Sequence, residues 1–382
     1  MTVWAELVGQ EPAVAVLSRA VAGESHAMTH AWLVIGPPGS GRSNAARAFA
    51  AALQCAEGGC GECQACRTSL SGAHPDVTLV RTEQLSIGID EVRELVRRAQ
   101  MSPTLGRSQV IVVEDADRIT DRGADALLKS IEEPAAKTVW ILCAPTAEDV
   151  VATIRSRCRL LTLTTPPDTA VARLLVERDG VEPAMAEYAA RAAQGHIGRA
   201  RKLARDEEAR ARRREVLMIP SRLTGLGPCL DAAANLVESC AAEAKAATAE
   251  LDHRERAELE EALGFGTKGA RPRQAAAALK ALEDQQKARA KRLQRDAIDR
   301  ALTELTAYHR DVLSLQTGAG ARLINPDLEH QLTAAARSST AEAPIRRIDA
   351  ILACRTALET NVAPLLAVEA MLIGLVEAQQ PV

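Results

Sequence analysis

The sequence has few aromatic residues, no long apolar run and almost no net charge. Three Trp, two Tyr and two Phe make up 2% of the 382 residues, so the cores must be built from Ala, Leu, Val and Ile. A protein that stacks nucleic-acid bases on aromatic rings is therefore disfavoured. The 47 basic and 50 acidic residues leave a formal net charge of −3, which excludes a protein that is basic throughout and coats DNA.

Two further absences concern the cellular compartment. No segment reaches the roughly 18 apolar residues without a charge that a membrane span requires, so we expect no membrane association. The N-terminal sequence MTVWAELVGQ lacks the basic region and apolar run of a secretory signal. We therefore expect a cytoplasmic protein whose thiols stay reduced. In such a protein, clustered cysteines indicate metal ligands before disulfides.

Apolar runs alternate with helical patterns in residues 1–165. Helical stretches near 41–54, 90–100 and 121–132 separate five short runs that are continuously apolar, as in a parallel sheet covered on both faces. The five runs are residues 31–35, 76–80, 109–113, 138–143 and 159–163. This alternation predicts a doubly wound α/β domain.

The remainder of the chain has a helical pattern. Residues 166–205 are interpreted as a small helical lid, and residues 206–382 as an Ala-rich helical domain. The segment GFGTKGARPR (264–273) combines Gly and Pro as helix breakers do. We therefore predict a long helical hairpin over residues 231–317 with its turn at this segment.

Two stretches of the helical part are rich in arginine and lysine, residues 199–215 and 287–295. Both also contain acids or follow a helical pattern, which favours solvated helix faces. A surface that faces DNA is the alternative.

Residues 36–43, GPPGSGRS, follow the first predicted strand and have the spacing of a phosphate-binding loop. Small residues at Gly36, Gly39 and Gly41 let backbone N–H groups surround a phosphate, and the following helix points its positive end at the anion. Ser43 stands where a hydroxyl would bind Mg²⁺. The order of strand, loop and helix therefore indicates that this segment derives from a nucleotide-binding loop.

Two departures from the usual pattern predict weak or absent hydrolysis. Arg42 replaces the expected lysine, and the two residues are not interchangeable at a packed phosphate site. Glu114 and Asp115 reverse the usual order of Asp and Glu after the strand at 109–113, which moves each carboxylate by roughly 1.5 Å. A misplacement of about 1 Å can cost around 100-fold in rate. Binding of ATP and Mg²⁺ without hydrolysis stays open.

Four cysteines, Cys55, Cys60, Cys63 and Cys66, lie within twelve residues. Four thiolates close a tetrahedral Zn²⁺ site and leave no position for catalysis, so we predict a structural zinc module over 55–66. An iron–sulfur cluster is disfavoured, because the bacterial run continues with Cys-Pro three residues further on. Most of the other cysteines are expected to be small core residues. They are Cys143, Cys158, Cys229, Cys240 and Cys354.

Further motifs accompany the loop and the cysteines. In chain order, the set comprises VGQ (8–10), HAWLVIGPPGSGRS (30–43), the four-cysteine insertion, HPD (74–76), ADALLKSIEEP (124–134) and IRSRC (154–158). This set resembles the clamp-loader subunits of bacterial DNA polymerase III, which are members of the AAA+ superfamily. The resemblance covers residues 1 to about 205 and implies an AAA+ domain and a lid. Beyond that point only the helical character matches, which implies a collar that holds a ring of subunits.

Two kinds of subunit carry these motifs in that family. Gamma or tau subunits hydrolyse ATP, whereas delta prime resembles them but has usually lost its own site. The altered Arg42, Glu114 and Asp115 make the chain similar to delta prime, which implies a hetero-oligomer with gamma/tau and delta subunits and no ATPase activity of its own. That assembly places the sliding clamp on primer–template DNA. The alternative is an ATP-hydrolysing gamma/tau-like motor. A free-standing zinc-stabilised nucleic-acid-binding protein is disfavoured by the charge and the few aromatics.

The resemblance also assigns a role to Arg157 in the Ser-Arg-Cys motif. It implies an arginine finger that reaches across an interface to the ATP bound on a neighbouring subunit. Such fingers can be worth about 10³–10⁵ in rate. An ordinary surface arginine is the alternative.

The motif LLKSIEEP is expected to be an amphipathic helix. Leu127, Leu128 and Ile131 would face the core, whereas Lys129 and the two glutamates would project outward. The resemblance implies that this helix faces the neighbouring subunit and the central DNA chamber.

Overall fold

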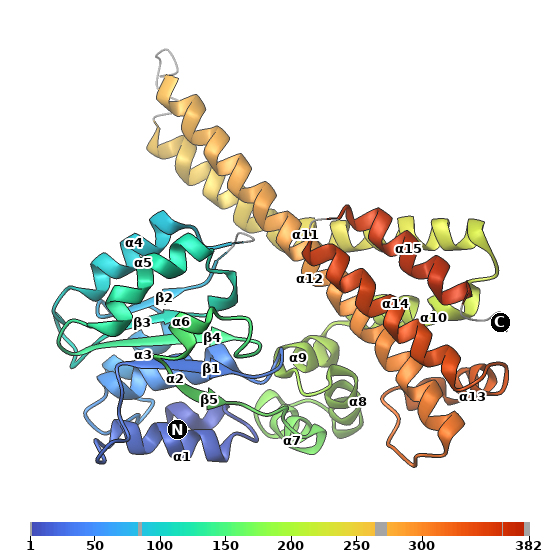
Figure 1. Cartoon of the computed structure of the whole chain (residues 1–382), viewed down its shortest axis with the longest axis horizontal. Helices are drawn as coiled ribbons and strands as arrows, with labels where there is room; N and C mark the ends of the chain where they lie inside the picture. Colours follow the sequence, from blue (N-terminus) through green and yellow to red (C-terminus); the bar gives the residue numbers. More distant parts are fainter. Residues whose placement is uncertain (1, 83–85, 264–272, 361, 378–382) are drawn as a thin grey trace. The chain divides into compact units, whose positions relative to one another are not determined.

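The computed structural model of the chain describes residues 2–82, 86–263, 273–360 and 362–377. The chain divides into two compact units, Met1–Arg205 and Asp206–Val382 (Figure 1). Each unit has a hydrophobic core of its own.

The first unit contains a five-stranded parallel sheet, as the apolar runs predict. Its strands are β1 (Ala31–Ile35), β2 (Val77–Val80), β3 (Gln109–Val113), β4 (Thr138–Ala144) and β5 (Arg159–Thr162). The strand order is β2-β3-β4-β1-β5. Ile35 pairs with Ala144, and Val113 pairs with Leu142, so the carboxyl ends of β1, β3 and β4 lie at one edge of the sheet. Loops at this edge are where α/β folds place their ligands.

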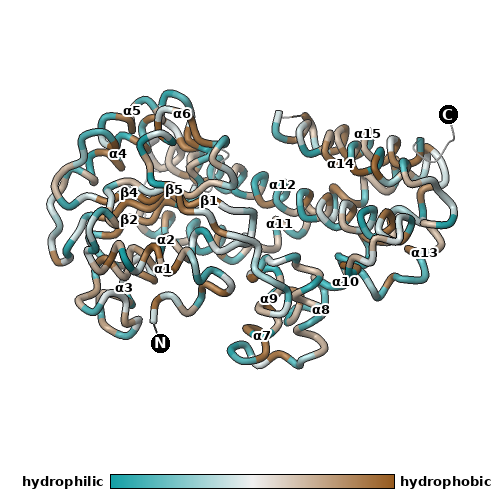
Figure 2. The backbone as a smooth tube through the Cα atoms, turned by 60° about the horizontal axis from the view of Figure 1, so that its bottom comes forward, coloured by the Kyte–Doolittle hydropathy of each residue, from teal (hydrophilic) through white to brown (hydrophobic). Residues whose placement is uncertain are grey.

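Helices cover both faces of the sheet, which confirms the doubly wound prediction (Figure 2). Side chains alternate along β1: Trp32 and Val34 belong to the core under one set of helices, and Leu33 to the core under the other. The first set is η1 (Val3–Glu6), α1 (Glu11–Val21), α2 (Arg42–Gln54) and α3 (Gln64–Ser71). The second set is α4 (Ile89–Ala99), η2 (Ala116–Arg118), α5 (Asp121–Glu132) and α6 (Ala152–Arg155).

The cores are built from small and aliphatic side chains. Six alanines of α2 are buried, and the ring of Phe49 meets Trp32 edge to face at 5.1 Å between centroids. Leu127 and Ile131 of α5 are buried, as their helical spacing predicts. Four of the five cysteines outside the cluster are buried, and Cys158 is partly buried. All five therefore serve as small apolar residues.

Three short helices follow the sheet within the same unit: α7 (Asp168–Asp179), α8 (Pro183–Ala193) and α9 (Ile197–Arg205). Ion pairs connect α7 with α9 and with η1. Arg201 lies 2.8 Å from Asp179, and Arg178 lies 2.5 Å from Glu6. The interpretation of these helices as a separate lid stays a prediction.

The regular elements of the second unit are all helices within its described residues. Its elements are α10 (Glu207–Arg222), α11 (Leu226–Ala262), α12 (Arg273–Thr317), η3 (Pro326–Leu328), α13 (Glu329–Arg337), α14 (Glu342–Glu359) and α15 (Pro364–Glu377). The long helices α11 and α12 lie against each other (Figure 1). Helix α11 begins at Leu226, before the predicted start at 231, and α12 ends at Thr317. Residues 264–272 of the predicted turn lie outside the described residues. No helix of the described part is long and apolar enough to cross a membrane.

A buried polar cluster holds the second unit together. The guanidinium of Arg213 lies 3.1 Å from Glu304 and also donates a hydrogen bond to Asn325. The carboxylate of Asp311 accepts hydrogen bonds from the backbone N–H groups of Ile324 and Asn325. Because buried charges need both a partner and hydrogen bonds, these contacts connect α10, α12 and the loop before η3 in one arrangement.

Arginines of the two basic stretches bind the chain's own acids. Arg205 lies 3.1 Å from Asp179. Arg289 is buried between α11 and α12, 3.0 Å from Asp252, and also binds Glu255. Because Arg213 and Arg289 are buried and bind acids of the chain itself, the prediction of solvated helix faces is wrong at these two positions.

The HPD motif holds the loop before β3. Asp76 is buried, and its carboxylate accepts hydrogen bonds from the backbone N–H groups of Thr104 (2.6 Å), Leu105 (2.8 Å) and Gly106 (2.5 Å). Burial alone would raise the pKa of Asp76, but these donors outweigh it and hold the pKa below its usual value.

We expect Asp76→Asn to lower the free energy of unfolding by about 1–3 kcal/mol at neutral pH, because an amide cannot accept all three bonds. Because the folded pKa is depressed, the stabilisation is present above the unfolded-state value of about 3.9 and is lost as pH falls through the folded value. The difference from wild type, measured by urea unfolding, should therefore shrink on acidification. Asp90→Asn, at an exposed position, is the matched control. A difference that persists unchanged into acid would contradict the account.

Candidate functional site

The glycine-rich loop connects β1 to α2 at the carboxyl edge of the sheet. Gly39 and Gly41 have φ values of +87° and +94°, which residues with a Cβ rarely adopt. The backbone N–H of Gly36 donates to the carbonyl of Pro145 at 3.1 Å, which connects the start of the loop to the end of β4. Ser43 lies in the first turn of α2. The local backbone therefore has the tight curl that the glycines permit.

Arg42 begins α2 and turns its guanidinium back onto the loop. One of its terminal amino groups donates to the carbonyl of Gly36. Burial lowers the pKa of Arg42, whereas the neighbouring Cys143, Asp117 and Asp115 act in the opposite direction. The guanidinium that would bind a phosphate at this loop therefore already donates a hydrogen bond to the loop itself.

The reversed acid pair follows β3, and both of its carboxylates lie near arginines. The buried Glu114 forms an ion pair with Arg47 of α2, with Oε1 2.7 Å from the guanidinium. Asp115 Oδ1 lies 4.0 Å from Arg118 Nε. In this arrangement Oε1 of Glu114, one of the two carboxylate oxygens that could bind Mg²⁺, is engaged by Arg47.

His196, between α8 and α9, lies against the loop, and the sequence motifs did not reveal it. A Cβ placed on Gly39 would come within 2.4 Å of the His196 Cα, Cβ and Cγ atoms. The buried Gln10 of the VGQ motif connects the same region, donating to the carbonyls of Ser40 (3.2 Å) and Thr164 (2.7 Å). His196, at the junction of α8 and α9, therefore covers one side of the glycine-rich loop. The available sequence signal was the segment Gly-His-Ile-Gly at residues 195–198.

Arg157 follows α6 and is half-exposed. Its guanidinium donates to the carbonyl of Thr153 at 2.7 Å and forms a 2.5 Å ion pair with Glu132 at the end of α5. The structure thus brings together the Ser-Arg-Cys and LLKSIEEP motifs, which are separated in sequence. Lys129 on the same helix is exposed, as predicted.

The four clustered cysteines have the geometry of a metal site. Their Sγ atoms all lie within 4.8 Å of one another, with Cys55 Sγ at 3.7 Å from Cys60 Sγ and at 3.8 Å from Cys63 Sγ. A tetrahedron with metal–sulfur bonds of about 2.3 Å has sulfur–sulfur edges of about 3.8 Å. The four residues therefore fit one tetrahedral ion.

Backbone N–H groups surround these sulfurs. Cys60 N and Glu57 N lie 3.5 and 3.4 Å from Cys55 Sγ, and Gly61 N lies 3.4 Å from Cys66 Sγ. Burial opposes ionisation of Cys55, but these donors lower its pKa to about 6. Burial and the neighbouring thiols raise the pKa of Cys66. Four adjacent thiolates therefore require a cation, and the N–H groups orient the sulfurs for one.

The cysteine cluster and the phosphate loop lie at opposite ends of one helix. Gly41 precedes α2, and Cys55 follows its 13 residues, so the two are about 20 Å apart. The metal site is thus too distant to act on anything bound at the loop.

Residues 9–167 match the family model described as "DNA polymerase III, delta subunit". The DNA polymerase III subunit gamma/tau of Mycobacterium tuberculosis is 38% identical over 190 residues, which cover 47% of this chain and 32% of that protein. The DNA polymerase III subunit delta′ of Pseudomonas aeruginosa is 39% identical over 135 residues, 34% of this chain and 41% of that protein. The chain thus spans less than half the length of either relative.

Among solved structures, a DNA polymerase III gamma subunit-related protein from Thermotoga maritima matches with a TM-score of 0.38 and 16% identity, covering 75% of this chain and 99% of that one. The sequence matches include both gamma/tau and delta′ subunits, and the residues that the family model matches include the loop, the cysteines and Arg157.

Proposed function

We propose that the chain is the delta-prime-type stator of a DNA polymerase III clamp loader, with an AAA+ module in its N-terminal unit, because residues 9–167 match the family model and this chain is similar in sequence to delta′ subunits. It would assemble in the cytoplasm with gamma/tau and delta subunits. The assembly would place the sliding clamp on primer–template DNA. The helices of the second unit would form the collar that holds the ring together.

The single observation that carries the stator assignment is the internal pairing of the nucleotide site. Arg42 is bound to the carbonyl of its own loop, and Glu114 is paired with Arg47. In ATP hydrolysis the Arg42 guanidinium would have to leave this carbonyl to bind phosphate, and Glu114 would have to bind Mg²⁺ while Arg47 compensates its charge. The loop keeps the backbone conformation of a phosphate-binding loop, but Arg42 and Glu114 bind other groups of the chain. This combination supports a subunit that has kept the nucleotide-binding fold and no longer hydrolyses ATP.

Arg157 is the group that would act in the assembly. It is half-exposed, and its partner Glu132 is half-exposed as well. Such surface pairs contribute little, typically under about 1 kcal/mol. The pair can therefore open when a neighbouring subunit presents an ATP phosphate. The planar guanidinium then binds the phosphate oxygens and neutralises the charge that develops during transfer.

Zinc is the ion we propose for Cys55, Cys60, Cys63 and Cys66. Four thiolates at tetrahedral spacing are typical of structural zinc, and no ligand position is left for water. Its role would be to connect the end of α2 to α3.

We expect the purified full chain to hydrolyse no ATP above the background of its own Arg42→Ala variant, with or without primed DNA. Both internal contacts favour this result, because Arg42 binds its own loop and Arg47 already compensates the charge of Glu114. Radiolabelled phosphate release is the measurement, and Arg19→Ala, at an exposed position of α1, is the control variant. Turnover that DNA stimulates and that Arg42→Ala abolishes would favour the gamma/tau-like motor, to which the mycobacterial relative belongs.

A further inference from the structure

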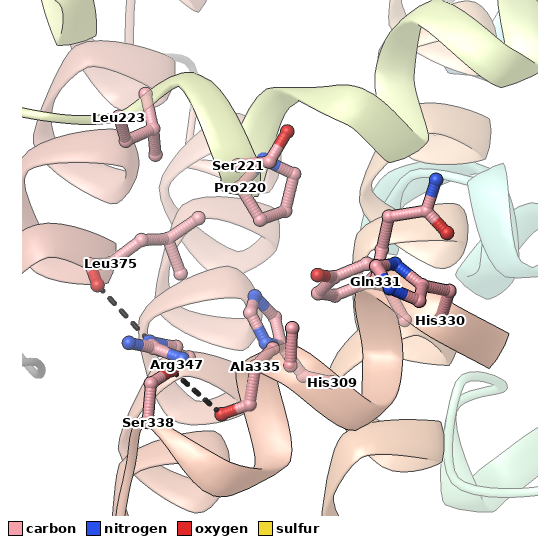
Figure 3. A pocket seen from close by; sticks show the side chains of 12 residues that line it. Pro220, Ser221, Leu223, His309, His330, Gln331, Ala335, Ser338, Arg347 and Leu375 are labelled. Carbon is pink, nitrogen blue, oxygen red and sulfur yellow. Dashed lines mark hydrogen bonds between the residues drawn. The ribbon is translucent and has the colours of Figure 1, made fainter. Parts of the chain in front are cut away.

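A cavity of about 620 Å³ lies within the second unit, apart from every residue discussed above as functional. It is lined by α10, α12, α13, α14 and α15 (Figure 3). Its polar lining includes Arg347, His309, His330 and Gln331. Clefts between helices of this size commonly hold small molecules.

Arg347 is a buried cation without a counter-charge. It is 6% exposed, and its Nε donates to the carbonyl of Leu375 at 3.2 Å. In the described part of the chain, its terminal amino groups have no hydrogen-bond partner and no carboxylate forms an ion pair with it. Burial lowers the pKa of this guanidinium. A buried charge without a partner is strongly destabilising, so an anion at this position would be stabilised.

His309 lies near Arg347 on the same cavity wall (Figure 3). It is 1% exposed, and neither ring nitrogen has a hydrogen-bond partner in the described structure. Burial, with a smaller contribution from Arg347, lowers its pKa to about 3. The imidazole is therefore neutral and offers one donor and one acceptor. Buried polar atoms without partners are uncommon in folded proteins, and two on one ring beside an unpaired cation indicate an absent ligand.

The rest of the lining combines apolar side chains with the hydroxyl-bearing residues Ser221, Tyr308 and Ser338. Pro220 and Leu223 come from the end of α10 and the residue after it, Ala335 from α13 and Leu375 from α15. An inorganic ion would leave this surface uncovered, whereas a ligand with an apolar body would cover it.

We propose that this cavity binds a small organic anion whose carboxylate or phosphate group pairs with Arg347 and hydrogen-bonds to His309. Its apolar body would lie against Pro220, Leu223 and Leu375. The guanidinium suits both head groups, because its planar fork donates two parallel hydrogen bonds to either. Because α10, α12, α14 and α15 all line the site, occupancy would stabilise the arrangement of the second unit.

The test uses the full chain labelled with ¹³C-histidine and two probes, benzoate and phenyl phosphate. We expect a saturable shift of the His309 resonance with an apparent Kd of about 1 mM or tighter for at least one probe. A shift with benzoate alone assigns a carboxylate ligand, and a shift with phenyl phosphate alone assigns a phosphate ligand. Inorganic phosphate, which lacks the apolar body, should bind more weakly than the better probe.

Variants at neighbouring arginines distinguish the site from general charge effects. Arg347→Gln should weaken binding about 10–100-fold, the range for a hydrogen bond to a charged group. Arg346→Gln removes an exposed arginine next in sequence and should change Kd less than twofold. Arg347→Lys, which keeps the charge in case the first variant fails to fold, should still weaken binding because it loses the fork. The proposal is wrong if wild type shows no saturable shift with either probe, or if binding survives Arg347→Gln unchanged.

Discussion

Replacing Arg157 by alanine in a reconstituted clamp loader is expected to lower the DNA-dependent ATPase rate of the assembly by about 10³–10⁵. The loss follows from removing the guanidinium that would stabilise the phosphoryl group on the neighbouring subunit. Steady-state turnover with primed DNA measures it. Because the chain itself is expected to have no ATPase activity, the effect would appear only in the assembly.

Two matched variants separate this role from local structure. Arg155→Ala removes a nearby arginine that donates to Ala147 O at 3.2 Å, and should leave the assembly rate within about twofold, as expected of a surface contact. Glu132→Gln removes the internal partner of Arg157 and should not slow turnover, because the guanidinium is freed. An Arg157→Ala assembly that forms normally and turns over at the wild-type rate would falsify the finger assignment.

Removing the proposed zinc is expected to unfold the loop over residues 55–66 and to destabilise the N-terminal unit. Structural zinc in small domains is worth about 10–16 kcal/mol of apparent binding free energy, which becomes folding free energy. The loop also holds the N-terminus, because Val3 N donates to Gly59 O at 3.0 Å. A Cβ on Gly59 would approach Val3 to 2.7 Å, so the two segments are in close contact. Metal loss should therefore loosen η1 as well.

Metal analysis of the purified chain should give about one equivalent of zinc, consistent with one four-thiolate site. Cys63→Ser should lose the metal and increase hydrogen exchange in η1 and α3. Cys354→Ser, at a buried cysteine of α14, should keep the metal and so controls for thiol loss in general. Less than about half an equivalent in wild type, with all four thiols free to alkylation, would defeat the claim.

The α/β fold could be predicted from sequence because the signals are local. The strands within residues 31–35, 109–113 and 138–143 are mainly apolar and buried, and the intervening helices have a helical period. The prediction of a buried strand at 159–163 was wrong in its burial, because β5 lies at the edge of the sheet and only its Leu161 is buried. The strand order could not be predicted in this way, since β1 pairs with β4 and β5 rather than with its neighbour in sequence. Which strands pair depends on how the helices pack across the whole sheet.

The candidate site likewise has features that the sequence predicts and features that only the fold reveals. The cysteine ligands could be named from their spacing, because a twelve-residue loop leaves its four thiols little freedom. The pairs of Arg42 with Gly36, Glu114 with Arg47 and Arg157 with Glu132 required the fold. The last two join residues far apart in the chain.

The sequence by itself determined which chemical groups this protein has: a phosphate loop with altered charges, four clustered thiols and a single Ser-Arg-Cys motif. Only the tertiary structure decided which of these groups form ion pairs or hydrogen bonds with other parts of the chain. Ion pairs and burial depend on side chains that packing brings together from distant parts of the sequence, so a local sequence pattern does not predict them. The same reason applies to Arg347 and His309, which carry no motif. They become a candidate anion site because the helices of the second unit bury them together without a counter-charge.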